Sequence, residues 1–305
     1  LHDRDRFEVV AVSFGPDDGS PDRKRVAAAA DQFVDLAGAS PAEMVSRVRS
    51  LDADIALDLM GHTARSADAA FGQRVAPVQV NFLGYPGTTG SREMDYIVLD
   101  PFIATDKVRR CASEKAVVLP HCYQPNDRRR PLPQEPRPRA AFGLPAEGFV
   151  FAAFNNTGKV TPAMFGAWMR ILAAVEDSTL WLFATDPAAI RGLRAETGKH
   201  GVSPDRLVIA GHLPVEEHLA RYLTAGLLLD TFPYGAHTTA SDALWVGCPV
   251  VTLAGQSFAS RVAGSLLHAV GLPELITHGL PEYEALAIAL ARDPERLAGL
   301  RRHLE

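Results

Sequence analysis

A lysine in the second half of the chain stands where it could hold a phosphate group. Lys159 ends the segment FNNTGK (154–159), shortly before an expected helix that Thr161 caps. A lysine there can neutralise a phosphate that the positive end of a helix also attracts. The other interpretation is a solvated lysine after two turn-forming asparagines, and it fits this short pattern better when the pattern is taken alone.

A histidine and two threonines form a second candidate for anion binding. His237, Thr238 and Thr239 lie in YGAHTTASDALW (234–245), where a helix is expected to begin. Two hydroxyls and the free backbone N–H groups of a helix start form an anion cradle that needs no metal. One threonine could instead be an ordinary N-cap, with Asp242 completing a capping box three residues after Thr239. A cap explains one threonine but not the whole run, so anion binding is favoured.

A third candidate lies on one face of an expected helix, in PVEEHLARY (214–222). His218 and Arg221 are three residues apart and therefore share a helix face. A histidine ring can stack on a nucleobase, and an arginine can reach a phosphate or a ribose. The alternative is a solvated face with a Glu217–Arg221 ion pair, and taken alone the segment favours that alternative.

A glycine-rich loop follows an expected strand in the first half, in NFLGYPGTTG (81–90). Because glycine lets a backbone approach a ligand closely, this loop could bind a ligand. The alternative interpretation is an ordinary turn. The spacing is not GxGxxG, so dinucleotide binding is unsupported. His62, which follows the preceding strand, could line the same site or could equally be a turn residue.

Composition excludes several other classes of protein. The 305 residues carry a net charge of −5 with a pI near 6.1, which argues against a nucleic-acid-binding protein. No apolar run reaches the roughly 18 residues of a membrane span. Three scattered cysteines form neither a disulfide framework nor a CxxC zinc site. We therefore expect a cytoplasmic protein with free thiols and with neither nucleic-acid nor membrane partners.

Strand-length apolar runs alternate with helical segments along the chain. Buried strands separated by helices indicate parallel sheets that are covered on both faces. Six prolines in residues 120–139 predict a linker between two such series. We predict an α/β protein with two doubly wound, Rossmann-like domains facing a cleft, the first over 1–138 and incomplete at its N-terminus, the second over 139–305. The expected strands are 7–14, 54–59, 77–84, 95–100, 115–120, 149–155, 179–184, 206–211, 226–230 and 248–254.

Helix starts are marked by capping residues followed by proline. Ser40 and Glu43 form a capping box around Pro41, which predicts a helix over 41–51. Thr161 with Pro162 begins another helix. In doubly wound sheets ligands bind beyond the carboxyl ends of the strands, which is where the candidate segments fall. Further helices are expected near 187–197, 215–223, 239–246, 257–268 and 281–303.

Several long strings resemble the O-GlcNAc transferase family, including its bacterial members. The related SPINDLY branch, which resembles a fucosyltransferase, shares much of this pattern. The strings GYPGTTG and GAHTTASDAL are closer to the O-GlcNAc branch. The matching strings lie at residues 74–102, 113–127, 154–162, 177–183, 229–255 and 258–272.

This resemblance implies a glycosyltransferase-B fold whose second domain binds most of a nucleotide-sugar. Two positions depart from the family, since Asn156 stands where animal enzymes carry glutamine and Val215 replaces a lysine near the uracil. By resemblance Lys159 is the catalytic residue, because it contacts the donor diphosphate. The other implied donor contacts are His237, Thr238 and Thr239 at the diphosphate, Asp242 near the ribose, His218 beside the uracil, Arg221 nearby, Asn156, and Leu83, Gly84 and Pro86 in the first domain.

The function implied by the resemblance is inverting, metal-independent transfer of N-acetylglucosamine from its uridine diphosphate to serine or threonine hydroxyls of proteins. No cofactor beyond this donor substrate is expected. An upstream first-domain segment and the tetratricopeptide repeats of the family are expected to precede the chain. The alternatives are transfer of fucose or another sugar, a non-catalytic nucleotide-sugar-binding module, and a sugar-nucleotide epimerase, for which no carboxylate base is evident.

Overall fold

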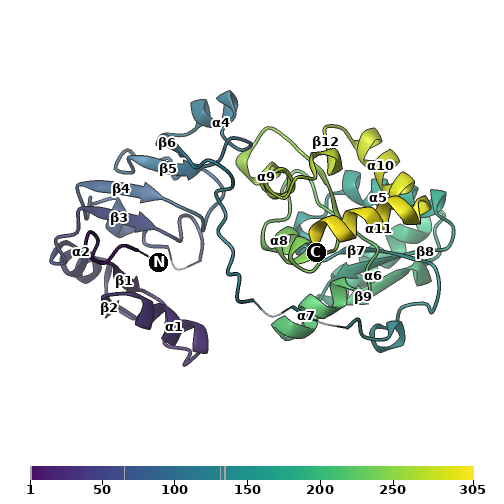
Figure 1. The fold of residues 1–305 in the computed structure, drawn as a ribbon, viewed down its shortest axis with the longest axis horizontal. Helices are drawn as coiled ribbons and strands as arrows, with labels where there is room; N and C mark the ends of the chain where they lie inside the picture. Colours follow the sequence, from purple (N-terminus) through teal and green to yellow (C-terminus); the bar gives the residue numbers. More distant parts are fainter. Residues whose placement is uncertain (1, 65, 131, 134) are drawn as a thin grey trace. The chain divides into compact units, whose positions relative to one another are not determined.

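The fold comprises two compact units. The computed structural model describes residues 2–64, 66–130, 132–133 and 135–305. The first unit contains the residues up to Leu99 together with Arg109–Leu119, and the second contains Asp100–Val108 and Pro120–Glu305. In Figure 1 the colours follow the chain from purple in the first unit to yellow at the end of the second.

All strands of the first unit are parallel and form two sheets. The larger sheet has the order β3-β4-β5-β6, and β1 pairs with β2 separately. Five of these strands were predicted; β2 was not, because its four residues QFVD contain only two apolar side chains. The strands are β1 (Val10–Ser13), β2 (Gln32–Asp35), β3 (Ile55–Asp58), β4 (Val78–Asn81), β5 (Tyr96–Leu99) and β6 (Lys115–Val118).

Four helices belong to this part of the chain. The helix predicted from the capping box is confirmed, since Ser40 and Glu43 cap each other's backbone at its start. The other three were not predicted: two contain no buried residue, and the third is only four residues long, with Ala70 and Phe71 buried. The helices are α1 (Pro21–Ala29), α2 (Pro41–Arg49), α3 (Asp68–Phe71) and α4 (Asp106–Cys111).

The second unit is built on one six-stranded parallel sheet with the order β12-β11-β10-β7-β8-β9. From the central β7 the chain runs outward to β9 and then returns to the other side of β7. This reversal is the hallmark of a doubly wound sheet and confirms the prediction for this half. The strands are β7 (Phe149–Ala153), β8 (Ser178–Phe183), β9 (Leu207–Ala210), β10 (Leu227–Leu229), β11 (Val250–Leu253) and β12 (Ile276–Thr277).

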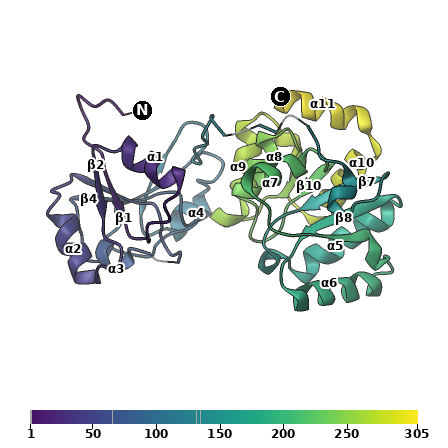
Figure 2. The ribbon, with the colours of Figure 1, turned by 90° about the horizontal axis from the view of Figure 1, so that it is seen from below.

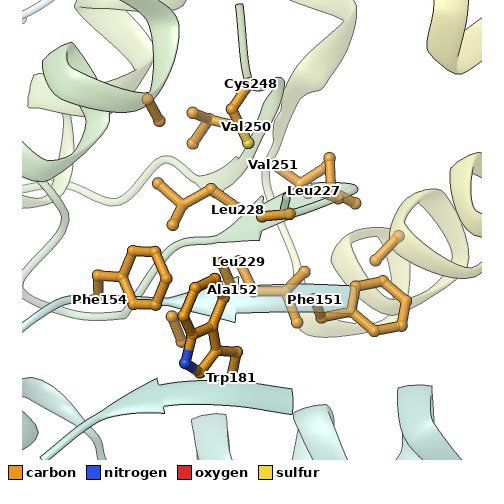
Figure 3. Close-up of a cluster of buried hydrophobic side chains, with 14 of the residues drawn as sticks. Phe151, Ala152, Phe154, Trp181, Leu227, Leu228, Leu229, Cys248, Val250 and Val251 are labelled. Carbon is orange, nitrogen blue, oxygen red and sulfur yellow. The ribbon is translucent and has the colours of Figure 1, made fainter. Parts of the chain in front are cut away.

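Helices cover both faces of this sheet. Figure 2 shows α5 and α6 on one side and α7, α8 and α9 on the other, and α10 packs against α5. Figure 3 shows Trp181 and the aliphatic side chains of β10 and β11 clustered along neighbouring strands of the sheet, where they are buried. The helices are α5 (Pro162–Ala174), α6 (Pro187–Lys199), α7 (Val215–Tyr222), α8 (Thr238–Trp245), α9 (Val262–Ala269), α10 (Leu280–Arg292) and α11 (Pro294–Leu304).

Two of the predicted helices are divided in the structure. The segment 281–303 forms α10 and α11, because Asp293 caps the second helix and Pro294 occupies its first position, where no N–H donor is required. The segment 257–268 begins as a 3-10 turn, Phe258–Ser260, before α9 starts. Within the described ranges, no helix combines the length and the apolar character needed to cross a bilayer.

The proline-rich segment has neither helix nor strand in its described residues between 120 and 138, as predicted. Its first part is nevertheless ordered, since Tyr123 is buried and its ring meets that of Phe258 edge-on at 5.1 Å. By packing, this segment and residues 100–108 belong with the second unit. The division into functional lobes 1–138 and 139–305 stays a prediction.

Candidate functional site

The candidate site lies where the strand order of the second unit reverses. β7 and β10 are parallel neighbours, with Phe151 opposite Leu227 and Ala152 opposite Leu228. Their carboxyl ends therefore meet at the same edge of the sheet. The loop after β7 leads to Lys159, and the loop after β10 leads to the start of α8. Such a reversal point is where doubly wound sheets bind ligands.

A buried carboxylate organises the loop after β10. Asp230 Oδ1 accepts hydrogen bonds from the backbone N–H groups of Thr231 and Ala236, each at 2.6 Å. Asn155 Nδ2 donates to the same oxygen at 3.1 Å, and Thr252 Oγ1 donates to the other at 2.6 Å. Burial raises the pKa of Asp230 although these donors oppose the shift. Asp230 thus ties the loop to both neighbouring strands.

Lys159 reaches this loop from the neighbouring strand. It ends a 3-10 turn, Thr157–Lys159, which Asn156 caps by accepting from the N–H of Gly158 at 2.8 Å. Its Nζ donates to the carbonyl of Gly235 at 2.9 Å and lies 4.2 Å from the centre of the Tyr234 ring. The ammonium is therefore held against the loop that enters α8, and it is not a freely solvated lysine.

The start of α8 offers uncapped backbone donors. The helix begins at Thr238, its N-cap is His237, and no side chain caps it. The capping interpretation of Thr238 and Thr239 is therefore wrong, because the backbone at His237 already occupies the cap position. The N–H groups of a first helical turn have no partner within the helix and can receive an anion.

His237 lines this site with an uncharged imidazole ring. Its Nε2 faces the carbonyl of Ala259 at 3.2 Å, and its ring stacks on Tyr234 with centres 5.2 Å apart. Burial lowers the pKa of His237 to about 4; the hydrogen bond to the Ala259 carbonyl opposes this shift, and the nearby Lys159 adds a smaller lowering. Near the start of α8 the positive charge is therefore supplied by Lys159 and not by His237.

Asp242 does not complete a capping box with Thr239, so the alternative interpretation of this segment is wrong. It lies one turn into α8, forms an ion pair with Arg130 and has its second oxygen 3.4 Å from Nε2 of His218. The carboxylate thereby joins α8 to α7 and to the proline-rich segment. Arg130 was missed from the sequence because it lies 112 positions from its partner in a segment that resembles a linker.

A cavity of about 240 Å³ opens beside His218. His218 and Arg221 both line it, which confirms that they share a helix face. Glu217 pairs with Arg137 at 2.8 Å, so the alternative of a solvated Glu217–Arg221 pair is wrong. The remaining lining residues are Phe154, Phe183, His212, Leu213 and Val215.

Arg221 supports the cavity wall. Its side chain is buried, donates to the carbonyl of Gly211 at 3.0 Å and lies 4.0 Å from the centre of the Phe154 ring. Burial lowers the pKa of Arg221 to about 10. These contacts hold the guanidinium against Gly211 and Phe154, and the suggestion that Arg221 reaches a phosphate or a ribose stays a prediction.

The chain resembles known proteins in both its sequence and its structure. A model of glycosyl transferase family 41 matches residues 1–135 and 136–305. The chain belongs to glycosyl transferase family 41. It is 36% identical to a mutant O-GlcNAc transferase of Thermobaculum terrenum, with a TM-score of 0.92 over 99% of the chain and 57% of that structure. The family-41 chain therefore has the predicted α/β fold of the glycosyltransferase-B type.

Curated plant relatives of this family-41 chain are much longer than it. The probable UDP-N-acetylglucosamine–peptide N-acetylglucosaminyltransferase SEC of Arabidopsis thaliana is 34% identical over 100% of the chain and 32% of that protein. The similarly named SPINDLY protein of the same plant is 33% identical over 99% of the chain and 34% of its own length. The chain thus spans about a third of the length of these relatives.

The glycine-rich loop of the family-41 chain lies in the first unit, after β4. Leu83 adopts a φ of 75°, which side chains rarely tolerate. Gly84 is exposed while Pro86 is buried. The buried carboxylate of Glu114, which the sequence did not single out, accepts from the N–H and hydroxyl of Thr89 at 2.7 Å each. Glu114 thereby fixes the end of the loop, as Asp230 does in the second unit.

Replacing Gly84 is expected to disturb this loop. A Cβ atom at Gly84 would lie 2.1 Å from the carbonyl oxygen of Leu59, so the backbone must move. We expect Gly84→Ala to lower the free energy of unfolding by about 1–3 kcal/mol, measured by urea denaturation. The control is Gly192→Ala, in a helix with open space around it, which should be neutral or stabilising. If Gly84→Ala unfolds with the same free energy as the parent, the backbone at Gly84 is not too close to Leu59 to accept a Cβ atom.

The charge of Lys159 predicts a pH limit for anion binding. Burial lowers the pKa of Lys159, and Asp230 only partly restores it. The ammonium is therefore lost as the pH rises through a value below the usual lysine pKa of about 10.4. We expect the affinity of this site for a diphosphate anion to fall over this alkaline range, as measured by calorimetry with inorganic pyrophosphate. Lys159→Met should bind weakly at every pH and show no such fall; a matching decline in both proteins would exclude Lys159 as its cause.

Proposed function

We propose that this family-41 chain transfers N-acetylglucosamine from its uridine diphosphate to serine or threonine hydroxyls of proteins. Its relatives carry names that state this donor and a peptide acceptor. The observation that carries the proposal is the ammonium of Lys159, held 2.9 Å from Gly235 O in the loop that enters α8. All three cysteines lie in the described part of the chain as free thiols, which supports the predicted cytoplasmic location.

The proposed reaction is a displacement at the anomeric carbon of the sugar. The bond from that carbon to the diphosphate oxygen breaks while a bond to the acceptor hydroxyl oxygen forms, and the hydroxyl proton passes to water, so that the products are the glycosylated protein, uridine diphosphate and a proton. Attack from the face opposite the leaving group inverts the configuration. Negative charge grows on the departing diphosphate, where Lys159 and the first-turn N–H groups of α8 can stabilise it. Because these groups are already in place, no metal is required by this proposal.

The neighbouring cavity suits the nucleoside end of the donor. His218 offers a ring that can stack on a base, and the buried Arg221 lines the same cavity from the same face of α7. Asp242 lies beside His218, and we propose it as the contact to the ribose. We propose that Asn156 shapes the turn that presents Lys159. Leu83, Gly84 and Pro86 stay proposed contacts to the sugar and phosphates, contributed by the first unit.

Two measurements test the proposal. Calorimetric titration should show tighter binding of uridine diphosphate than of guanosine diphosphate. Mass spectrometry of serine- and threonine-containing peptides should detect a gain of one N-acetylhexosamine with the uridine diphosphate donor and no product with guanosine diphosphate-fucose. The reverse donor preference would favour the fucosyltransferase alternative. Binding without transfer, alongside transfer by a longer protein that contains this chain, would identify a binding module.

A further inference from the structure

The proline-rich segment begins with a strap, residues 122–130, that is packed on the helices of the second unit. Tyr123 is buried at 2% exposure, and its N–H donates to Asp100 Oδ2 at 3.0 Å. Ser265 in α9 donates to the same carboxylate at 2.5 Å. The beginning of the strap is therefore anchored in the core of the unit, which restricts the positions that its later residues can take.

The end of the strap lies against α8. Ser241 Oγ donates to Asn126 Oδ1 at 2.6 Å, and Arg130 forms an ion pair with Asp242. The Arg130 guanidinium also lies 6.0 Å from the centre of the Trp245 ring. Its side chain is 21% exposed and that of Asp242 is 9% exposed, so water screens this pair much less than a surface pair.

Without a partner, Asp242 would oppose the binding of a diphosphate. It lies one turn below the start of α8, where an unpaired negative charge would repel an anion and where burial makes an unpaired charge costly. Its other cationic neighbours are His218, at 3.4 Å and charged only when it is protonated, and the buried Arg221, whose pKa Asp242 helps to raise. Arg130 contacts the other carboxylate oxygen with a guanidinium, a group well suited to pairing with a carboxylate.

We propose that Arg130 is a positioning residue for the nucleotide: it neutralises Asp242 and fixes its orientation beside His218, so that the start of α8 can accept a diphosphate. This inference rests on the proposed function and adds one residue of the strap, Arg130, to the groups that position the nucleotide. Arg130 acts through Asp242 and is not itself a contact to the ligand. The strap is thereby more than a connection between the two halves of the sequence.

A double-mutant cycle on uridine diphosphate binding tests this role. By calorimetry, we expect Arg130→Met to weaken binding roughly 10- to 100-fold, the range expected when a hydrogen-bonded charge loses its partner. In an Asp242→Asn background the same substitution should cause no further loss, because no charge remains to be neutralised. Arg130→Lys, which keeps the charge, should bind with an affinity between those of Arg130→Met and the parent. Arg129→Met is the matched control, since its side chain is 76% exposed, and it should bind like the parent.

Each outcome decides a separate point. If the parent chain does not bind uridine diphosphate, the proposed function fails and this inference fails with it. If the parent binds and Arg130→Met binds equally well, only the inference is overturned. If Arg130→Met weakens the binding of uridine diphosphate by the same factor in the Asp242→Asn background as in the parent, Arg130 does not act through Asp242. Circular dichroism monitors folding, and if Arg130→Met does not fold, the same cycle with Arg130→Lys decides between these outcomes.

Discussion

Lys159→Ala is expected to lower the rate of sugar transfer by roughly 10²–10³-fold, the usual cost of removing one fixed group that stabilises developing negative charge. The substitution removes the ammonium that lies 2.9 Å from Gly235 O beside the start of α8. It leaves the neutral His237 and the backbone donors in place, so some binding should persist. The turnover number, measured with a peptide acceptor at saturating donor, is the direct readout.

Two further variants separate charge from packing at this position. Lys159→Met keeps an aliphatic side chain of similar length but removes the ammonium that lies over the Tyr234 ring, so it should retain the melting temperature of the parent and still lose transfer. Lys199→Ala removes an exposed lysine that pairs with Glu196 on the same helix and should leave both properties unchanged. Turnover of Lys159→Ala within tenfold of the parent would remove this lysine from the proposed reaction.

Asp230→Ala is expected to have the largest effect on stability of any substitution at this site. It deprives two backbone N–H groups, an amide of Asn155 and the hydroxyl of Thr252 of their acceptor in a buried position. We expect the free energy of unfolding to fall by about 3–5 kcal/mol, measured by denaturant titration. Transfer should be lost as well, because the loop that holds Gly235 against Lys159 is no longer tied to the sheet.

Thr252→Val provides the matched comparison for Asp230. It removes one hydrogen bond to the carboxylate and leaves the two loop N–H groups bonded, so we expect a loss of about 1.5–3 kcal/mol with transfer retained. Equal effects of Asp230→Ala and Thr252→Val on both stability and transfer would show that the carboxylate does not organise the loop.

The central sheet of the second unit could be predicted from the sequence because its strands are short, apolar and separated by capped helices. Strings such as GLLLD and CPVVTLA are buried in the structure as expected. Boundaries were less certain where two helices follow each other directly. Asp293 and Pro294 end one helix and start the next within two residues, a break that apolar periodicity alone does not reveal.

Whether a residue of the candidate site could be predicted from the sequence depends on how near in the sequence its partners are. Lys159 and the His-Thr-Thr run were found because they follow strands in the sequence. Asp230 and Arg130 were missed, since their role depends on partners that are distant in sequence. The terminal Asp of GLLLD was an available signal, because a carboxylate after a buried strand must find donors. For Arg130, one arginine among three in RRR, the sequence contained no comparable signal.

A crystal structure of this chain with bound uridine diphosphate tests the central claim most directly. The account predicts diphosphate oxygens within about 2.7–3.2 Å of Lys159 Nζ and of the backbone N–H groups at Thr238 and Thr239, with the base in the cavity beside His218. A diphosphate bound elsewhere, with Lys159 still directed only at Gly235, would contradict it.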